Sequence, residues 1–170
     1  MVLEQDSIFP TATTGADEFF ISEAEQRLTP RIVVKTANQT NTGTTTLAND
    51  TELFMSVSAD SVYEFELTFQ ADEETGGDED MHSQFSFPTG ATGKQELVAE
   101  AGSLATTFIC ASLDADLRIE INQADGWQRI RGYVKTGNTA GNLQWRWAKA
   151  DADTYDLVVY AGAWLKVTKK

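Results

Sequence analysis

The chain has 170 residues, with 13 Lys and Arg against 26 Asp and Glu, which leaves a net charge of −13. Its length fits one domain with a sizeable core, and its aromatic content of 10% favours a globular body over a disordered chain. The negative charge argues against nucleic acid and anionic membranes as partners, because both require a positive field on the protein.

The charge is divided unevenly along the chain. Residues 1–110 contain 4 basic and 19 acidic residues, whereas residues 111–170 contain 9 basic and 7 acidic residues. Two interpretations are open: one face toward solvent and one toward a partner, or charges that decorate exposed strand faces. The single cysteine, Cys110, rules out an intrachain disulfide and is expected to be a buried, inert thiol. We find no signal peptide at the N-terminus and no apolar run of membrane-spanning length.

Residues 1–30 read as an extended, polar N-terminal arm, with Pro10 and Gly15 as breakers. Ser22 and Glu25 have the spacing of a capping box, which predicts a short helix that Pro30 ends. The large apolar residues of the arm need a surface to pack on, either on its own body or on a neighbouring subunit. The candidates for such contacts are Phe9, Phe19, Phe20 and Ile21.

From residue 31 onward the pattern predicts strands. Residues 61–70 alternate strictly, with Tyr63, Phe65, Leu67 and Phe69 on one face and acidic Glu64 and Glu66 on the other. Residues 142–150 alternate in the same way. Further strands are expected at 31–37, 52–57, 82–88, 104–111, 117–122, 127–135, 155–160 and 163–168. Short strands separated by turn signals predict an all-β fold for residues 31–170, an antiparallel β-sandwich of jelly-roll-like form.

The segment 71–82 concentrates carboxylates: six lie within nine residues, and the only histidine, His82, follows them. The spacing does not match the alternating ligands of an EF-hand, so we interpret the segment as a solvated hairpin tip. A looser calcium site remains the alternative, with Asp78 and Asp80 as candidate ligands. His82 by itself makes neither a zinc site nor a general base, because each needs further partners.

No motif of an enzyme class occurs in the chain: there is no G-x-S-x-G, no H-E-x-x-H and no phosphate-binding loop. A pair of glycosidase carboxylates would have to face each other across a cleft, yet Glu64 and Glu66 point away from the aromatic face of their strand. We therefore expect a protein without enzymatic activity and without a cofactor.

Residues 127–147 interleave aromatic and basic side chains. Trp127, Tyr133, Trp145 and Trp147 could form a surface that stacks on sugars or single strands, or they could fill the core. Alternation with Gln144 and Arg146 favours the core for Trp145 and Trp147. We expect Arg129, Arg131 and Arg146 to pair with acidic groups in the body or on another subunit.

Several stretches resemble virion structural proteins of tailed bacteriophages. Residues 31–69 carry a Lys-Thr-Ala start, a Thr-rich stretch, the motif Leu-x-Asn-Asp-Thr-Glu-Leu and a Tyr-x-Phe strand. "FPTGATG" (87–93), "GNLQWRWAKADAD" (141–153) and "VVYAGAWLKV" (158–167) continue the resemblance. It implies a β-sandwich protein of the particle, a homotrimer without enzymatic activity, and it does not extend to residues 1–30.

Together these features predict a capsid decoration (cement) protein that binds the outside of the phage head and stabilises contacts between major capsid subunits. Its expected partners are the major capsid protein and itself, and its expected location is the capsid surface after assembly in the host cytoplasm. The alternative is a tail or fibre component that binds host-surface glycans through exposed aromatic residues.

Overall fold

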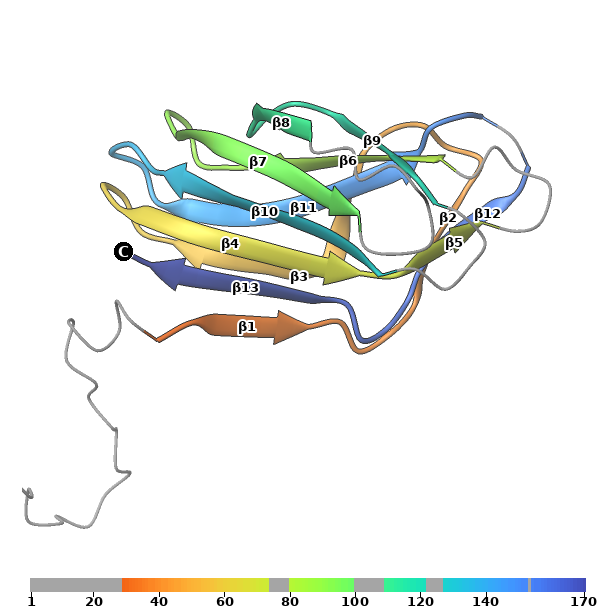
Figure 1. Cartoon of the computed structure of the whole chain (residues 1–170), viewed down its shortest axis with the longest axis horizontal. Coiled ribbons are helices and arrows are strands. Elements are labelled where there is room, and N and C mark those ends of the chain that lie inside the picture. The colour runs from red at the N-terminus through yellow and green to blue at the C-terminus, as the bar shows by residue number, and fades with distance from the viewer. Residues whose placement is uncertain (1–28, 74–79, 100–108, 122–126, 153) are drawn as a thin grey trace, which may run out of the picture.

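The computed structural model describes residues 29–73, 80–99, 109–121, 127–152 and 154–170. These residues form strands that pair antiparallel throughout, as Figure 1 shows. In chain order they are β1 (Arg31–Val34), β2 (Gln39–Thr42), β3 (Ala48–Val57), β4 (Val62–Phe69), β5 (Ala71–Glu73), β6 (Asp80–Ser86), β7 (Thr92–Ala99), β8 (Ile109–Ser112), β9 (Leu117–Glu120), β10 (Gln128–Lys135), β11 (Gly141–Lys149), β12 (Asp156–Val159) and β13 (Trp164–Lys169).

Two sheets stack face to face and enclose the core (Figure 1). One has six strands in the order β1-β13-β4-β10-β7-β8, and the other has four in the order β3-β11-β6-β9. A third, three-stranded sheet, β2-β12-β5, lies at one end of the sandwich. The predicted fold class is therefore confirmed: the chain is all-β, an antiparallel sandwich of jelly-roll-like form.

Period-2 alternation directs the large side chains into the space between the sheets. Phe65 and Phe69 of β4 face the four-stranded sheet, where their rings meet those of Phe85 at 4.8 Å and Trp145 at 4.7 Å between centroids. Trp145 and Trp147 are 0% and 1% exposed, so the prediction that both belong to the core is confirmed. Burying each such side chain contributes on the order of 1.5–3 kcal/mol to folding.

Three strands were missed from the sequence: β2, β5 and β7. The most consequential is β7, which occupies an inner position of the six-stranded sheet between β10 and β8. Its sequence, "TGKQELVA", has a glycine as its second residue and is rich in residues that favour helices. Local preference therefore does not indicate a strand. Pairing with β10 along the whole of its length overrides that preference.

The acidic segment is not a simple hairpin tip, which corrects our interpretation. Asp72 and Glu73 belong to β5, which pairs with β12, whereas Asp80 begins β6, which pairs with β11 and β9. The chain thus changes sheets between β5 and β6. Glu73 is buried, and its carboxylate lies 2.5 Å from the ammonium of the equally buried Lys149. Residues 74–79, including the candidate ligand Asp78, lie outside the described residues.

Candidate interaction face

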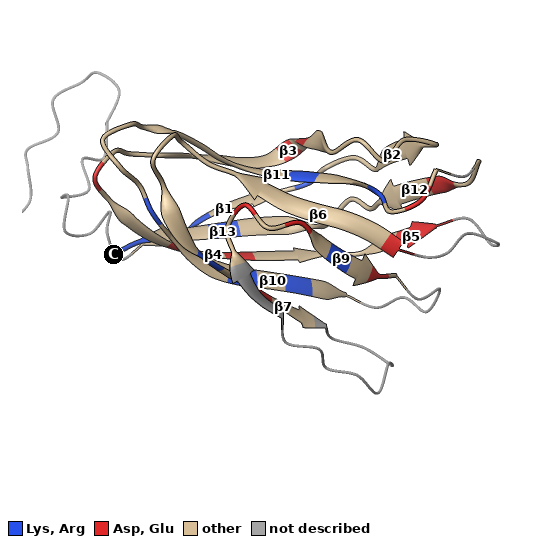
Figure 2. Ribbon diagram, turned by 90° about the horizontal axis from the view of Figure 1, so that it is seen from above, with Lys and Arg blue, Asp and Glu red and all other residues tan. Residues whose placement is uncertain are grey.

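The outward surface of the six-stranded sheet differs in charge from the chain as a whole. We call it the outer face and define it by the side chains that point away from the core on β1, β13, β4, β10 and β7. Its charged members are Glu64, Glu66, Glu96, Lys94, Arg129, Arg131, Lys135, Lys166 and Lys170. Six cations against three carboxylates give a balance of +3, in a chain with a net charge of −13. Blue segments on β10 in Figure 2 mark part of this face.

The strand register arranges these charges in rows of alternating sign. Lys166, Glu66, Arg131 and Glu96 stand side by side on four neighbouring strands. The guanidinium of Arg131 lies 2.9 Å from Glu96, and Glu66 lies 3.2 Å from Arg129 and 3.7 Å from Lys166. A hydrogen bond to the Glu96 side chain raises the pKa of Arg131 above its ordinary value. Such cross-strand pairs stabilise a sheet by a few tenths of a kcal/mol each (about 0.2–1).

A shallow groove of about 620 Å³ crosses this face over β13, β4, β10 and β7. Gly132 is among its lining residues, and an added Cβ there would come within 2.7 Å of the Phe65 ring and 2.2 Å of the Lys94 carbonyl oxygen. Tyr133, 46% exposed, stands beside it. The rest of the lining is charged, with Glu64, Lys94, Arg131, Lys166 and Lys170 among its members.

Exposed apolar side chains gather on the same face. Of the six large hydrophobic residues that are exposed in the described part of the chain, five point outward from this sheet or its margin. They are Ile32, Val34, Val62, Trp127 and Tyr133, whereas Phe54 lies on the other sheet. Single exposed hydrophobic residues are ordinary, but their concentration on one face marks a surface suited to contact.

Our candidate contact residues are separated by the fold. Arg129 and Arg131 share the outer face and are two positions apart on β10. Arg146 lies on β11 of the opposite sheet, where its guanidinium donates to the Leu47 carbonyl oxygen at 3.0 Å and to Gln84 Oε1 at 3.3 Å. Phe9, Phe19, Phe20 and Ile21 of the arm lie outside the described residues.

The second candidate calcium ligand, Asp80, is engaged elsewhere. Its Oδ2 accepts hydrogen bonds from Arg118 Nε at 2.7 Å and lies 2.6 Å from Arg118 Nη2. His82, on the same strand, is paired through Nδ1 with Asp116. Within the described residues, no group of three or more His, Cys, Asp or Glu side chains is arranged to hold a metal ion.

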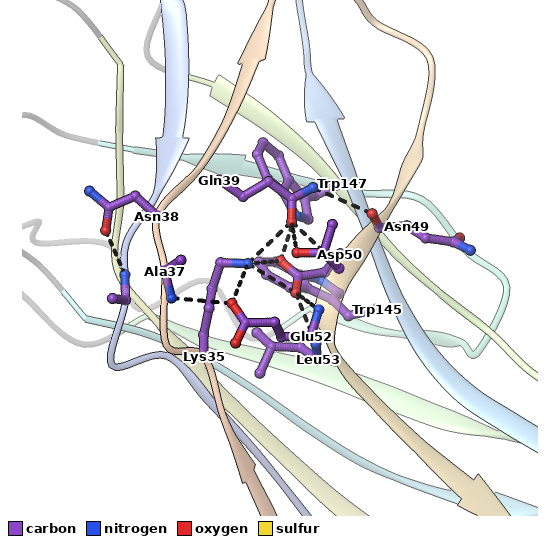
Figure 3. A network of polar contacts seen from close by, with 12 residues as sticks. Lys35, Ala37, Asn38, Gln39, Asn49, Asp50, Glu52, Leu53, Trp145 and Trp147 are labelled. Carbon is purple, nitrogen blue, oxygen red and sulfur yellow. Dashed lines mark hydrogen bonds and ion pairs between the residues drawn. The ribbon is translucent and has the colours of Figure 1, made fainter.

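A network of polar contacts was not predicted from the sequence, although its two segments had been noticed as motifs. We call it the polar joint; its members are Lys35, Thr36, Asp50 and Glu52. Lys35 opens the Lys-Thr-Ala stretch and Asp50 lies in Asn-Asp-Thr-Glu-Leu; the structure places the ammonium 2.9 Å from Asp50 Oδ2 (Figure 3). The backbone N–H and hydroxyl of Thr36 both donate to Glu52 Oε2. The two motif segments thus contact each other in the folded chain.

A bulge in β3 carries Asp50 inward. Between the pairs Gln144↔Phe54 and Arg146↔Asn49 the register shifts, so residues 50–53 oppose a single residue of β11. Asp50 Oδ1 accepts the N–H groups of Glu52 and Leu53, each at 2.9 Å, and Oδ2 accepts Trp147 Nε1 at 3.1 Å. The carboxylate therefore satisfies backbone donors released by the bulge and anchors an indole of the core.

Comparison with known proteins identifies no family. No family model matches the chain, and no curated protein matches it significantly. Among solved structures, it is similar to that of infectious bursal disease virus, Gx strain, at 12% identity over 94% of this chain and 45% of the other, with a TM-score of 0.15. The VP2 subviral particle of that virus is also similar, at 12% identity over 94% of this chain and 45% of the other, with a TM-score of 0.17. The chain spans less than half of those chains, and TM-scores this low carry no argument about fold or function.

The described residues contain no helix that is long and apolar enough to span a membrane.

Proposed function

We propose that this protein is a capsid decoration (cement) protein of a tailed bacteriophage, which binds the outside of the head and holds adjacent major capsid subunits together. The resemblance of residues 31–69, 87–93, 141–153 and 158–167 to phage particle proteins supports the class of protein. The observation that supports the outer face as the contact surface is its composition: it has a positive charge balance and five exposed hydrophobic residues, on a chain that is strongly acidic.

In this proposal the protein acts mechanically. The sandwich supplies a packed body, since the ring of Trp145 meets that of Phe69 on the opposite sheet and the buried pair of Lys35 and Asp50 joins the end of β1 to β3. Contact with the capsid would be made by the arm, through Phe9, Phe19, Phe20 and Ile21, and by arginines of the outer face. Interface area buried at each site, summed over many copies in a homotrimeric arrangement, would resist the pressure of packaged DNA.

Arg129 and Arg131 are the better placed of the three arginine candidates, because both are on the outer face and retain exposure while paired. In a contact with acidic capsid residues they would exchange Glu66 and Glu96 for partners on the capsid. Arg146 is occupied within its own sheet and would contribute only if the capsid also touched the opposite face.

The experiment that tests the proposal is localisation in the intact particle. Cryo-electron microscopy of virions should show extra density of this size on the outer surface of the head, and gold-labelled antibodies against the protein should decorate heads. Density or label confined to the tail would contradict the proposal. A second experiment adds purified protein to undecorated heads. The full chain should cosediment with the heads, and a chain that lacks residues 1–30 should not.

A tail or fibre component that binds host glycans is the second candidate. The observation in its favour is that Trp127 and Tyr133 are 40% and 46% exposed and both point outward from the six-stranded sheet. Aromatic faces of this kind stack on sugar rings. A glycan array would test it: hits that Tyr133→Ala or Trp127→Ala abolishes would favour this candidate, whereas a blank array would remove its support.

A further inference from the structure

We propose that the outer face is the docking site of the chain's own N-terminal arm, residues 1–28, in the free protein. The inference goes beyond the proposed function and does not depend on it. The arm contains six carboxylates and one arginine, a net charge of −5, together with Phe9, Phe19, Phe20 and Ile21. The outer face carries the opposite balance, +3, and most of the exposed apolar side chains of the described residues. Arm and face therefore match in charge and in hydrophobicity.

The match is sharpest around Tyr133. Lys94 stands directly across from Tyr133 on β7, and Lys135 follows two residues later on β10 with its side chain on the same face. We call Lys94, Tyr133 and Lys135 the lysine–tyrosine patch. Both lysines are exposed, and no described carboxylate lies within 4.0 Å of either ammonium. The other four cations of the face are already paired with its glutamates.

The arm carries a segment of complementary chemistry, "DEFF" at residues 17–20. Asp17 and Glu18 supply two adjacent negative charges for the two lysines. Phe19 and Phe20 are large apolar residues that would gain from contact with the Tyr133 ring and the wall of the groove. Contacts of charge with charge and ring with ring would form together only where both kinds of group are adjacent, as they are at this patch.

The arm is also attached in the right place. It enters the body at β1, which is the edge strand of the same sheet. Arg31, at the start of β1, pairs with Val167 of β13, three residues before Lys170, which is among the residues that line the groove. From β1 to β10 there are three strand spacings, about 14 Å at about 4.8 Å each. The eleven residues from Phe20 to Arg31 reach about 36–40 Å when extended, so the arm can lie on this face without strain.

Tethering favours the chain's own arm over that of a second copy. A segment joined to its site by a short stretch of chain experiences an effective concentration on the order of millimolar, far above that of a free protein in dilute solution. A capsid that takes up the arm would then have to compete with the outer face, and high salt, which screens the charges, would release the arm.

Limited proteolysis of the full chain tests the docking. Chymotrypsin cleaves after phenylalanine, and the rate of cleavage at Phe19 and Phe20 reports how far the arm is held. Replacing Lys94 and Lys135 by glutamine should raise that rate at least threefold at low salt, and 0.5 M NaCl should raise it in the wild type. The matched control, Thr45→Glu with Thr154→Glu, changes net charge by the same −2 at exposed positions beside the three-stranded sheet and should leave the rate unchanged. Equal rates in wild type and lysine variant, fast or slow, would overturn the proposal.

Cross-linking decides which arm is bound. Wild-type chains labelled with ¹⁴N and ¹⁵N are mixed and treated with a carbodiimide, which joins lysines to carboxylates in direct contact. Cross-links from Lys94 or Lys135 to Asp17, Glu18, Glu23 or Glu25 should join peptides of the same isotope. Mixed-isotope pairs at the statistical fraction would show that a second copy supplies the arm, and absence of these cross-links would overturn docking altogether. Neither result depends on binding to phage heads, so failure here and failure of the decoration proposal are distinguishable.

Discussion

The ammonium of Lys35 lies 2.9 Å from Asp50 Oδ2, and both side chains are fully buried between the end of β1 and the bulge of β3. Isolated charges are costly in a protein interior, so each of these residues is tolerated because of the other. Lys35 Nζ also donates to Gln39 Oε1, and Asp50 Oδ2 also accepts from Trp147 Nε1, each at 3.1 Å. It therefore joins β1, β2, β3 and β11, which belong to all three sheets.

Breaking this pair should destabilise the fold strongly. Asp50→Ala leaves Lys35 buried without its counter-charge and leaves the N–H groups of Glu52 and Leu53 without their acceptor, so the free energy of unfolding should fall by about 3–5 kcal/mol. Urea denaturation followed by far-UV circular dichroism measures this. The surface variant Glu64→Ala, which removes an exposed ion pair with Lys170, should cost less than about 1 kcal/mol. Similar losses in the two variants would contradict the role assigned to the joint.

The Glu52 carboxylate should make stability depend on pH. Hydrogen bonds from the Thr36 side chain and backbone lower the pKa of Glu52 below its ordinary value of 4.5. A lowered folded-state pKa stabilises the fold fully above 4.5, and this contribution disappears as the pH falls through the folded-state value. The melting temperature of wild type should therefore exceed that of Glu52→Gln by more at pH 6 than at pH 3. Thr36→Ala, which removes the largest cause of the shift, should flatten the difference, and a gap that is constant with pH would refute the assignment.

Tryptophan fluorescence should separate the core from the outer face. Trp127 is 40% exposed, whereas Trp145 and Trp147 are buried and donate their indole N–H groups to Ser83 and Asp50. Acrylamide should therefore quench Trp127 most strongly and the partly buried Trp164 less, and Trp127→Phe should remove a large part of the quenchable emission without loss of stability. Trp147→Phe should leave the quenchable emission in place while lowering the midpoint of denaturation, because Asp50 loses a donor. Loss of the quenchable emission in Trp147→Phe but not in Trp127→Phe would contradict the exposures of these two side chains in the structure.

Gly132 should tolerate no side chain. An added Cβ would meet the Lys94 carbonyl oxygen at 2.2 Å and the Phe65 ring at 2.7 Å, and the carbonyl belongs to a paired strand that cannot move freely. Gly132→Ala should lower the free energy of unfolding by about 1–3 kcal/mol, as overpacking does in well-filled interiors. Gly137→Ala, where the nearest atom is 3.1 Å away, should cost less. Equal stability of Gly132→Ala and wild type would show that the packing of β10 against β7 and Phe65 is looser than the structure indicates.

The sequence predicted those parts of the fold in which a local pattern has one structural meaning. The alternation in residues 61–70 placed Tyr63, Phe65, Leu67 and Phe69 in the core and Glu64 and Glu66 outside, and the structure confirms it. The same pattern identified Trp145 and Trp147 as core residues. It failed at β7, whose polar, helix-favouring residues become a strand only because β10 and β8 lie on either side of it.

The candidate face shows the same division. That Arg129 and Arg131 point outward on one strand follows from period 2 and could be read from the chain. Other features of the face depend on the register among strands that are distant in sequence. The register puts Lys166, Glu66 and Glu96 in the same row, and it places Lys94 opposite Tyr133. Glu73 is the clearest case: among six clustered carboxylates it looked solvated, yet Lys149, which is 76 positions away, draws it into the interior.

By itself, then, the sequence determined the all-β class, the sides of the clearest strands and the excess of negative charge, because these depend on local alternation and on composition. Only the tertiary structure decided how that charge is distributed: which carboxylates are buried against lysines, and that a chain of net charge −13 presents one face with a positive balance. The physical reason is that pairing between charges is set by distances across strands and sheets, and those distances exist only once the chain has folded.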